Sequence, residues 1–234
     1  MRFLVLFLLF VFPVFALTTD TMVFKKIQKD FDSIIVKDLN NKKMIFSKDE
    51  NQILRPASLT KIMTAILAIE SKKMNSIVVI TPEMKKVEPT VLNFKVGEKF
   101  YLKDLVHAAL IKSANDAATA IAIYLGNGNK QKFVDMMNIK AKKLGMRNTH
   151  FTNPCGFDFG NHSSTANDLL KLTEYSIKNR TFNSIVKLEK YSFLAINTKS
   201  KYTIHSSNKL LANEPYIIGI KTGYTNGAGA CLIA

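Results

Sequence analysis

The sequence predicts an α+β fold in which an antiparallel sheet, built from N- and C-terminal strands, packs on a central cluster of helices. Strand-like segments occur near both ends of the chain, and helical periodicity fills the middle. The chain has 234 residues, of which 47% are hydrophobic, and this suits one globular domain with a sizeable core.

The expected strands lie at residues 33–36 and 43–46, which flank the turn-forming residues 38–41, and at residues 216–223. The first two should form a hairpin. The sequence then stops at residue 234, inside an apolar run that begins at Cys231. Because chain ends usually emerge at the surface, this ending predicts that the catalytic domain is truncated at its C-terminus.

Apolar side chains at helical spacing predict five helices between these strands, over residues 58–71, 102–110, 115–125, 130–144 and 165–175. Gly126 and Gly145 end the third and fourth helices. Thr165 and Asp168 resemble a capping box at the start of the fifth.

Residues 1–16 are predicted to be a signal peptide. Arg2 gives a positive start, residues 3–15 are almost unbroken apolar sequence, and residues 14–16 suit cleavage after Ala16. The apolar run is shorter than the roughly 20 residues of a membrane span, although an uncleaved anchor is the alternative reading. Residues 17–32 would lead into a catalytic domain over residues 33–234, and the domain should be exported in either case.

The net charge of +15 comes mainly from lysines that are scattered along the chain. There is no arginine-rich stripe with interleaved aromatic residues, so nucleic-acid binding is not expected. A basic surface favours an anionic wall or membrane surface. Cys155 and Cys231 could pair in an exported protein, or could be small buried thiols. The four histidines lack metal-ligand spacing, and no metal or other cofactor is predicted.

Ser58 and Lys61 form a Ser-x-x-Lys pair at the start of the first expected helix. Residues three apart share a helix face, so the hydroxyl and the amine can come within hydrogen-bond reach. A serine needs a base to become a nucleophile, and a lysine serves as one when its pKa is lowered. The same spacing recurs at Ser184/Lys187 and at Ser206/Lys209, so this signal alone is weak.

Two further motifs make the pattern specific. Ser113-Ala114-Asn115 is a Ser-x-Asn element ahead of a helix, and Lys221-Thr222-Gly223 ends a strand-like run. These three elements occur in the same order in penicillin-binding proteins and class A β-lactamases.

With these motifs in place, the chain resembles the low-molecular-mass penicillin-binding proteins, the serine D-alanyl-D-alanine carboxypeptidases of the peptidase S11 type. The resemblance runs from about residue 33 to the end and rests on residues 55–65, 113–118, 151–156, 164–168 and 221–229. It implies a β-lactamase/transpeptidase-like fold. It also implies a hydrolase that removes the terminal D-alanine from peptidoglycan pentapeptides through an acyl-enzyme, and that β-lactams inhibit covalently.

The resemblance also implies the roles of the site residues. Ser58 would attack the carbonyl between two D-alanines, Lys61 would take its proton, and Ser113 would relay a proton to the leaving amine. Asn115 would hold the substrate amide and Lys61.

In the same way, Lys221 and Thr222 would bind the terminal carboxylate, and Gly223 would let an extended substrate lie close to the strand. The backbone N–H groups of Ser58 and Tyr224 would form the oxyanion hole. The implied location is the periplasm or the outer face of the cytoplasmic membrane. Family members continue into further strands, a β-rich domain and an amphipathic anchor, so a full-length form would associate peripherally with that membrane.

Two alternatives stay open at this point. A class A β-lactamase would need a glutamate in a Glu-x-x-Leu-Asn loop after the Ser-x-Asn element, and residues 153–168 contain none. Glu88 with Leu92-Asn93 comes before Ser113 and is spaced one residue too far. A catalytically weak wall-binding fragment would not need the intact motif side chains. The sequence leaves the balance between carboxypeptidase and endopeptidase activity undetermined.

Overall fold

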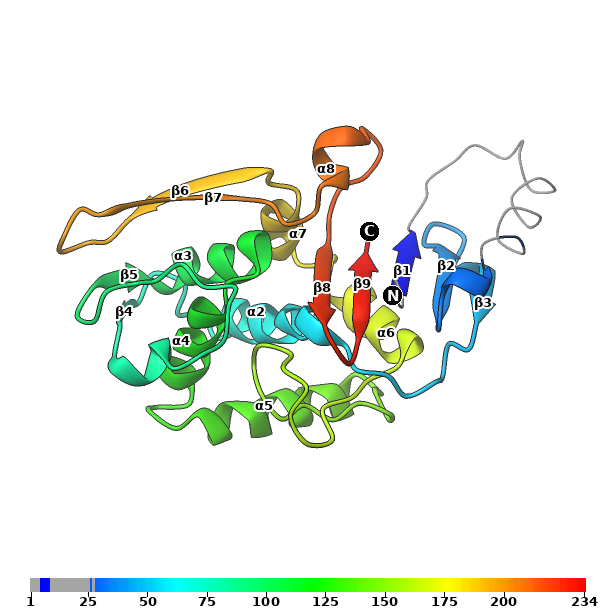
Figure 1. The fold of residues 1–234 in the computed structure, drawn as a ribbon, viewed down its shortest axis with the longest axis horizontal. Helices are drawn as coiled ribbons and strands as arrows, with labels where there is room; N and C mark the ends of the chain where they lie inside the picture. Colours follow the sequence, from blue (N-terminus) through cyan, green and yellow to red (C-terminus); the bar gives the residue numbers. More distant parts are fainter. Residues whose placement is uncertain (1–4, 9–25, 27) are drawn as a thin grey trace.

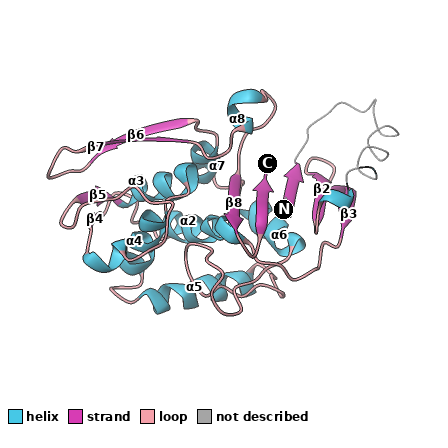
Figure 2. Ribbon diagram, viewed as in Figure 1, coloured by secondary structure: helices cyan, strands magenta, loops and turns pink. Residues whose placement is uncertain are grey.

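The computed structural model describes residues 5–8, 26 and 28–234 (Figure 1). Its main sheet has the strand order β3-β2-β1-β9-β8, so the first and last strands of the chain meet in one layer. Their bounds are Val5–Leu8 for β1, Ile34–Asp38 for β2, Lys43–Lys48 for β3, Lys221–Thr225 for β8 and Gly229–Ile233 for β9. The predicted α+β architecture, with a helical cluster beside the sheet, is confirmed (Figure 2).

The sheet consists of two antiparallel hairpins joined by a central strand. β2 pairs with β3, and β8 pairs with β9, both antiparallel. β1 lies between the hairpins and runs parallel to both β2 and β9. The predicted antiparallel pattern therefore holds within each hairpin, and β1 makes the sheet mixed.

Of the predicted signal peptide, residues 1–16, the structure describes Val5–Leu8 as strand β1. The predicted cleavage site after Ala16 and most of the lead-in lie outside the described residues. Export and the domain boundaries therefore stay predictions. Within the described part of the chain, no helix combines the length and the apolar character that a bilayer crossing requires.

The five predicted helices are present with small shifts of their ends. They are α2 (Lys61–Glu70), α3 (Leu102–His107), α4 (Asn115–Leu125), α5 (Lys130–Lys143) and α6 (Ala166–Ser176). A 3-10 turn, Ala57–Thr60, precedes α2, and a π-helical turn, Ala108–Lys112, follows α3. Two short helices, α7 (Arg180–Val186) and α8 (Leu210–Asn213), were not predicted.

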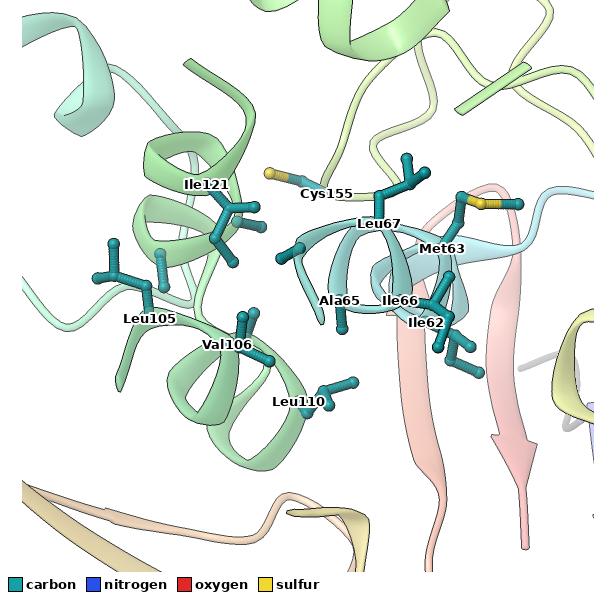
Figure 3. Packing of buried hydrophobic residues seen from close by; sticks show 14 of the residues in the cluster. Ile62, Met63, Ala65, Ile66, Leu67, Leu105, Val106, Leu110, Ile121 and Cys155 are labelled. Atoms are coloured by element: carbon teal, nitrogen blue, oxygen red, sulfur yellow. The ribbon is translucent and has the colours of Figure 1, made fainter. Parts of the chain in front are cut away.

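Helix α2 runs through the centre of the molecule (Figure 1). All its residues from Lys61 to Ala68 are buried, which explains why its sequence is apolar on every side. Ile62 and Met63 lie on the side of α2 that faces β8 and β9, and Val106 and Ile121 approach the opposite side from α3 and α4 (Figure 3). The start of α2 is therefore fixed between the sheet and the helices.

The predicted strand at residues 216–223 begins only at Lys221. Lys221 pairs with Ile233 of β9, and the run is strand only over residues 221–223 and on to Thr225. Two small antiparallel sheets were also missed by the sequence analysis. They pair β4 (Ile77–Val79) with β5 (Lys99–Tyr101), and β6 (Lys190–Leu194) with β7 (Lys201–His205).

A buried glutamate joins the β6–β7 hairpin to the rest of the protein. Glu98 is only 1% exposed and accepts hydrogen bonds from the Tyr202 hydroxyl at 2.6 Å and from the Thr198 hydroxyl at 3.1 Å. Its carboxylate also accepts the backbone N–H of Lys95 at 2.8 Å. The hairpin leads directly to Ser206 and Ser207, so this anchor fixes a segment that borders the cleft described below.

We expect Glu98→Ala to lower the free energy of unfolding by about 2–3 kcal/mol, because it removes a buried charged acceptor and leaves its donors unpaired. Denaturant unfolding monitored by circular dichroism measures the change. Glu83→Ala is the matched control, since Glu83 forms an exposed ion pair with Lys86 and should cost less than about 0.5 kcal/mol. Equal losses in the two variants would contradict the anchoring role.

Candidate active site

Ser58 lies in the 3-10 turn that leads into α2, with Lys61 at the first position of the helix. Lys61 Nζ donates to Ser58 Oγ at 2.8 Å and to the carbonyl oxygen of Cys155 at 2.7 Å. The Lys61 side chain is fully buried, and this burial lowers its pKa to about 8. At a pKa of about 8, about a tenth of the Lys61 amine is neutral at pH 7, and this neutral form can take the proton of Ser58.

A second buried lysine stands on the other side of the site. Lys221 begins β8, is 1% exposed, and donates from Nζ to Ser113 Oγ at 2.8 Å and to the carbonyl of Thr222 at 2.7 Å. Burial, together with the positive charge of Lys61, lowers the pKa of Lys221 well below its usual value. Two buried lysines this close repel each other when both are charged, so an anion bound beside them would be stabilised.

Ser113 and Asn115 reach the site from the loop between the π-helical turn and α4. Ser113 has the left-handed φ of 64° at the end of that turn. Asn115 Nδ2 donates to the carbonyl of Glu88 at 2.9 Å, and its backbone N–H donates to that of Thr90 at 2.7 Å. Asn115 therefore anchors residues 88–90. It was expected to hold Lys61, but the second hydrogen bond of Lys61 goes to the Cys155 carbonyl.

Ser58, Ser113 and Asn115 border one cleft of about 610 Å³. One wall is strand β8 with its following turn, from Thr222 to Asn226, and the other is formed by residues 88–90, 112–115 and 155–157. Ser58 lies between the walls, with Lys61 and Lys221 buried beneath. The structure thus brings together all the site residues predicted from the sequence, from Ser58 to Tyr224.

The turn at Ser58 is packed tightly between two glycines. A Cβ on Gly223 would lie 2.9 Å from the backbone nitrogen of Ser58, and one on Gly156 would lie 1.8 Å from the carbonyl oxygen of Ala57. Ala57 itself has a positive φ of 46°, a conformation that costs on the order of 1 kcal/mol for a residue with a Cβ. The neighbouring backbones therefore hold the nucleophile in a strained turn.

Sequence reasoning missed several residues that organise this site. Ser207 Oγ lies 2.7 Å from Thr222 Oγ1, and both residues line the cleft. Asn153 Oδ1 accepts the N–H groups of residues 155, 156 and 157 and so shapes the loop whose carbonyl binds Lys61. Asp158 accepts from Thr225 Oγ1 at 2.9 Å and from the N–H of Gly227 at 3.0 Å. The signal for Asn153 was present in the 151–156 segment, because asparagine side chains often bond backbone N–H groups a few residues on.

The two competing Ser-x-x-Lys pairs lie outside the cleft. Ser184 is exposed on α7 and donates to the carbonyl of Thr181 at 2.9 Å. Ser206 Oγ accepts the N–H of Asn208 at 3.1 Å. Cys155 and Cys231 are both buried free thiols, and burial raises the pKa of each.

Comparisons with known proteins agree with this geometry. A protein-family model described as D-alanyl-D-alanine carboxypeptidase, peptidase S11, matches residues 20–234. The carboxypeptidase DacF of Bacillus subtilis is 34% identical over 199 residues, which are 82% of this chain and 50% of the relative. A D-alanyl-D-alanine endopeptidase of Escherichia coli is 34% identical over 210 residues, 86% of this chain and 65% of the relative.

Solved structures show the same fold. A D-alanyl-D-alanine carboxypeptidase of Mycobacterium tuberculosis superposes with a TM-score of 0.77 at 33% identity, covering 84% of this chain and 74% of that one. The Streptomyces K15 DD-transpeptidase gives a TM-score of 0.77 at 28% identity, covering 82% and 79%. The chain spans between half and about two thirds of the length of the curated relatives described above.

Gly156→Ala should disrupt the site, because no L side chain fits against the Ala57 carbonyl without moving the turn that carries Ser58. We expect a loss of stability of about 3 kcal/mol or more, measured by thermal unfolding. Gly145→Ala is the control, since Gly145 has a similar positive φ of 71° but nothing within 4 Å of an added Cβ. It should lose only the backbone term of about 1 kcal/mol. If both substitutions cost the same, the close approach at Ala57 is not what requires glycine.

Proposed function

Because the chain belongs to the peptidase S11 family of D-alanyl-D-alanine carboxypeptidases, we propose that it removes the terminal D-alanine from peptidoglycan stem peptides through a serine acyl-enzyme. The observation that carries this proposal is the 2.8 Å hydrogen bond between Ser58 Oγ and the fully buried Lys61. This hydrogen bond sets a hydroxyl nucleophile that lines an open cleft beside a lysine whose pKa is lowered.

In acylation, neutral Lys61 accepts the proton of Ser58 while Oγ attacks the carbonyl carbon between the two D-alanines. Negative charge then develops on the carbonyl oxygen. The backbone N–H groups of Ser58 and Tyr224 are the proposed donors for it, and such a donor contributes about 3 kcal/mol. A Cβ on Gly223 would lie 2.9 Å from the Ser58 nitrogen, so β8 runs directly against the turn that carries the nucleophile. This close approach supports the use of N–H groups from both segments as the two donors.

The leaving D-alanine carries a carboxylate and a developing amine. Thr222, with Ser207 beside it, and Lys221 offer hydroxyl and ammonium groups that suit the carboxylate. The arriving anion favours the charged form of Lys221, which burial disfavours in the empty site. Ser113, which accepts a hydrogen bond from Lys221 Nζ, is the proposed relay: it gives its hydroxyl proton to the leaving amine and takes up the proton that Lys61 removed from Ser58, so Lys61 is neutral again. Asn115 borders the same cleft and is the proposed holder of the substrate amide.

Water then attacks the acyl carbonyl and gives a proton to Lys61, and Lys61 returns it to Ser58 Oγ as the ester bond breaks. Penicillins present a reactive amide with a nearby carboxylate, so the same groups should open them and leave a covalent adduct. Glu88 borders the cleft, but its carboxylate is exposed and makes no hydrogen bond to Ser58 or Lys61 among the described residues. A β-lactamase-like deacylation through a dedicated glutamate therefore has no support in this site.

The proposed location is outside the cytoplasm, in the periplasm or at the outer face of the membrane, where the substrate is found. The apolar residues 3–15 before Ala16 and the net charge of +15 support export and attraction to an anionic wall.

A fluorescent penicillin should label the protein covalently at Ser58. Ser58→Ala should abolish the label, and Ser184→Ala should retain it, because Ser184 lies on α7 away from the cleft. Gel fluorescence followed by peptide mapping reads out both variants. Labelling that persists in Ser58→Ala, or a wild-type chain that is never labelled, would favour a non-catalytic wall-binding protein.

The acylation rate should depend on the protonation of Lys61. Below its pKa of about 8 the neutral fraction falls about tenfold per pH unit, so the rate should fall in the same way and level off above pH 8. Stopped-flow acylation by penicillin across pH 5–10 gives the profile. Lys61→Arg should be inactive, since a guanidinium keeps its proton. An active Lys61→Arg variant would rule out the base role.

A further inference from the structure

A second cavity of about 470 Å³ opens beside the catalytic cleft. The two cavities share the residues Glu88, Cys155 and Phe157, so they adjoin along the wall that faces β8. We call the second cavity the lysine basin, because Lys85, Lys86 and Lys130 line it. None of the roles proposed above uses it.

The basin is electropositive. Lys86 Nζ lies 3.2 Å from Glu83 Oε2 and forms an ion pair with it. Lys85 and Lys130 form no ion pair with any carboxylate in the part of the chain that the structure describes. Glu88 is the acidic residue among the groups that line the cavity. With Lys86 compensated by Glu83, Lys85 and Lys130 against the single carboxylate of Glu88 leave an excess of positive charge around a concave space that also contains the polar side chains of Thr119 and Asn153.

The position of the basin determines which part of a substrate can reach it. The carboxylate of the leaving D-alanine is directed to Lys221 and Thr222 at the β8 wall. The basin opens from the opposite wall, past Glu88 and Phe157. A group that enters it must therefore come from the acyl half of the peptide, which stays bound to Ser58 after the D-alanine has left.

We propose that the lysine basin is a subsite for a carboxylate-bearing side chain on the acyl half of the peptide substrate. This inference rests on the proposed carboxypeptidase function and adds a selectivity to it. Lysine ammonium groups on flexible stems bind a carboxylate as point charges, without demanding one geometry. The gain should be modest and sensitive to salt, because the lysines are solvent-exposed.

The test compares two peptides that differ in one charge. The probes are acetyl-X-D-alanyl-D-alanine with L-2-aminopimelate at X, bearing either a free side-chain carboxylate or its neutral amide. Release of D-alanine gives kcat/KM for each. We expect the wild-type chain to prefer the free acid by about five-fold at low ionic strength, and the preference to shrink in about 0.5 M salt.

The double variant Lys85→Gln/Lys130→Gln should bring the ratio of the two kcat/KM values close to one. The matched control is Lys142→Gln/Lys143→Gln, which removes the same charge from the far end of α5 and should keep the preference. A preference lost equally in both double variants would point to long-range attraction by the whole protein and would overturn the subsite.

Penicillin acylation separates this inference from the function on which it rests, because the proposed reaction uses none of the basin lysines. All variants should acylate at the wild-type rate. If penicillin acylates the chain and both peptides are hydrolysed without a preference for the acid, the subsite is refuted and the carboxypeptidase function stands. If neither penicillin nor either peptide reacts, the proposed function itself fails.

Discussion

The burial of Lys61 behind Ser58 is the interaction on which the rest of the site depends. An ammonium without a carboxylate partner is costly in an apolar interior, so burial favours the neutral amine that catalysis requires. The amine is kept in place by Ser58 Oγ and the Cys155 carbonyl. That carbonyl is presented by a loop that Asn153 holds from within and that Thr64 binds at the Pro154 carbonyl, 2.8 Å away.

The same region shows how backbone crowding serves the chemistry. Ala57 adopts a positive φ and is enclosed by Gly156 and Gly223, so the turn before α2 has little freedom to relax. Thr60 adds a buried hydrogen bond of 2.8 Å to His162 Nε2. Burial lowers the pKa of His162 to about 4, so the ring is neutral at physiological pH and the contact adds no charge near Lys61.

The cleft is chemically asymmetric. Its β8 wall offers the Thr222 hydroxyl, with Ser207 beside it at the end of the β6–β7 hairpin and Lys221 buried behind. The opposite wall is formed by loops and opens into the lysine basin. In the proposed function the β8 wall would take the leaving D-alanine, and the opposite wall would contact the acyl half of the peptide.

The sequence by itself determined the helices and the three motifs, because both are local properties. Apolar periodicity is decided within a few turns of chain, and the Ser58–Lys61 spacing places two side chains on one helix face whatever surrounds them. The resemblance to a known family then suggested the roles proposed for Ser113 and Lys221, which follow Ser58 in the same motif order.

Tertiary structure decided what depends on contacts between distant segments. In the structure β8 begins at Lys221, opposite Ile233 of β9, whereas the residues before Lys221 look equally strand-like in the sequence. The short strands β4 to β7 are stabilised by their cross-strand partners rather than by their own composition. Ser207, Asp158 and the lysine basin gained their positions only when loops far apart in the chain packed together, since no local pattern encodes that proximity.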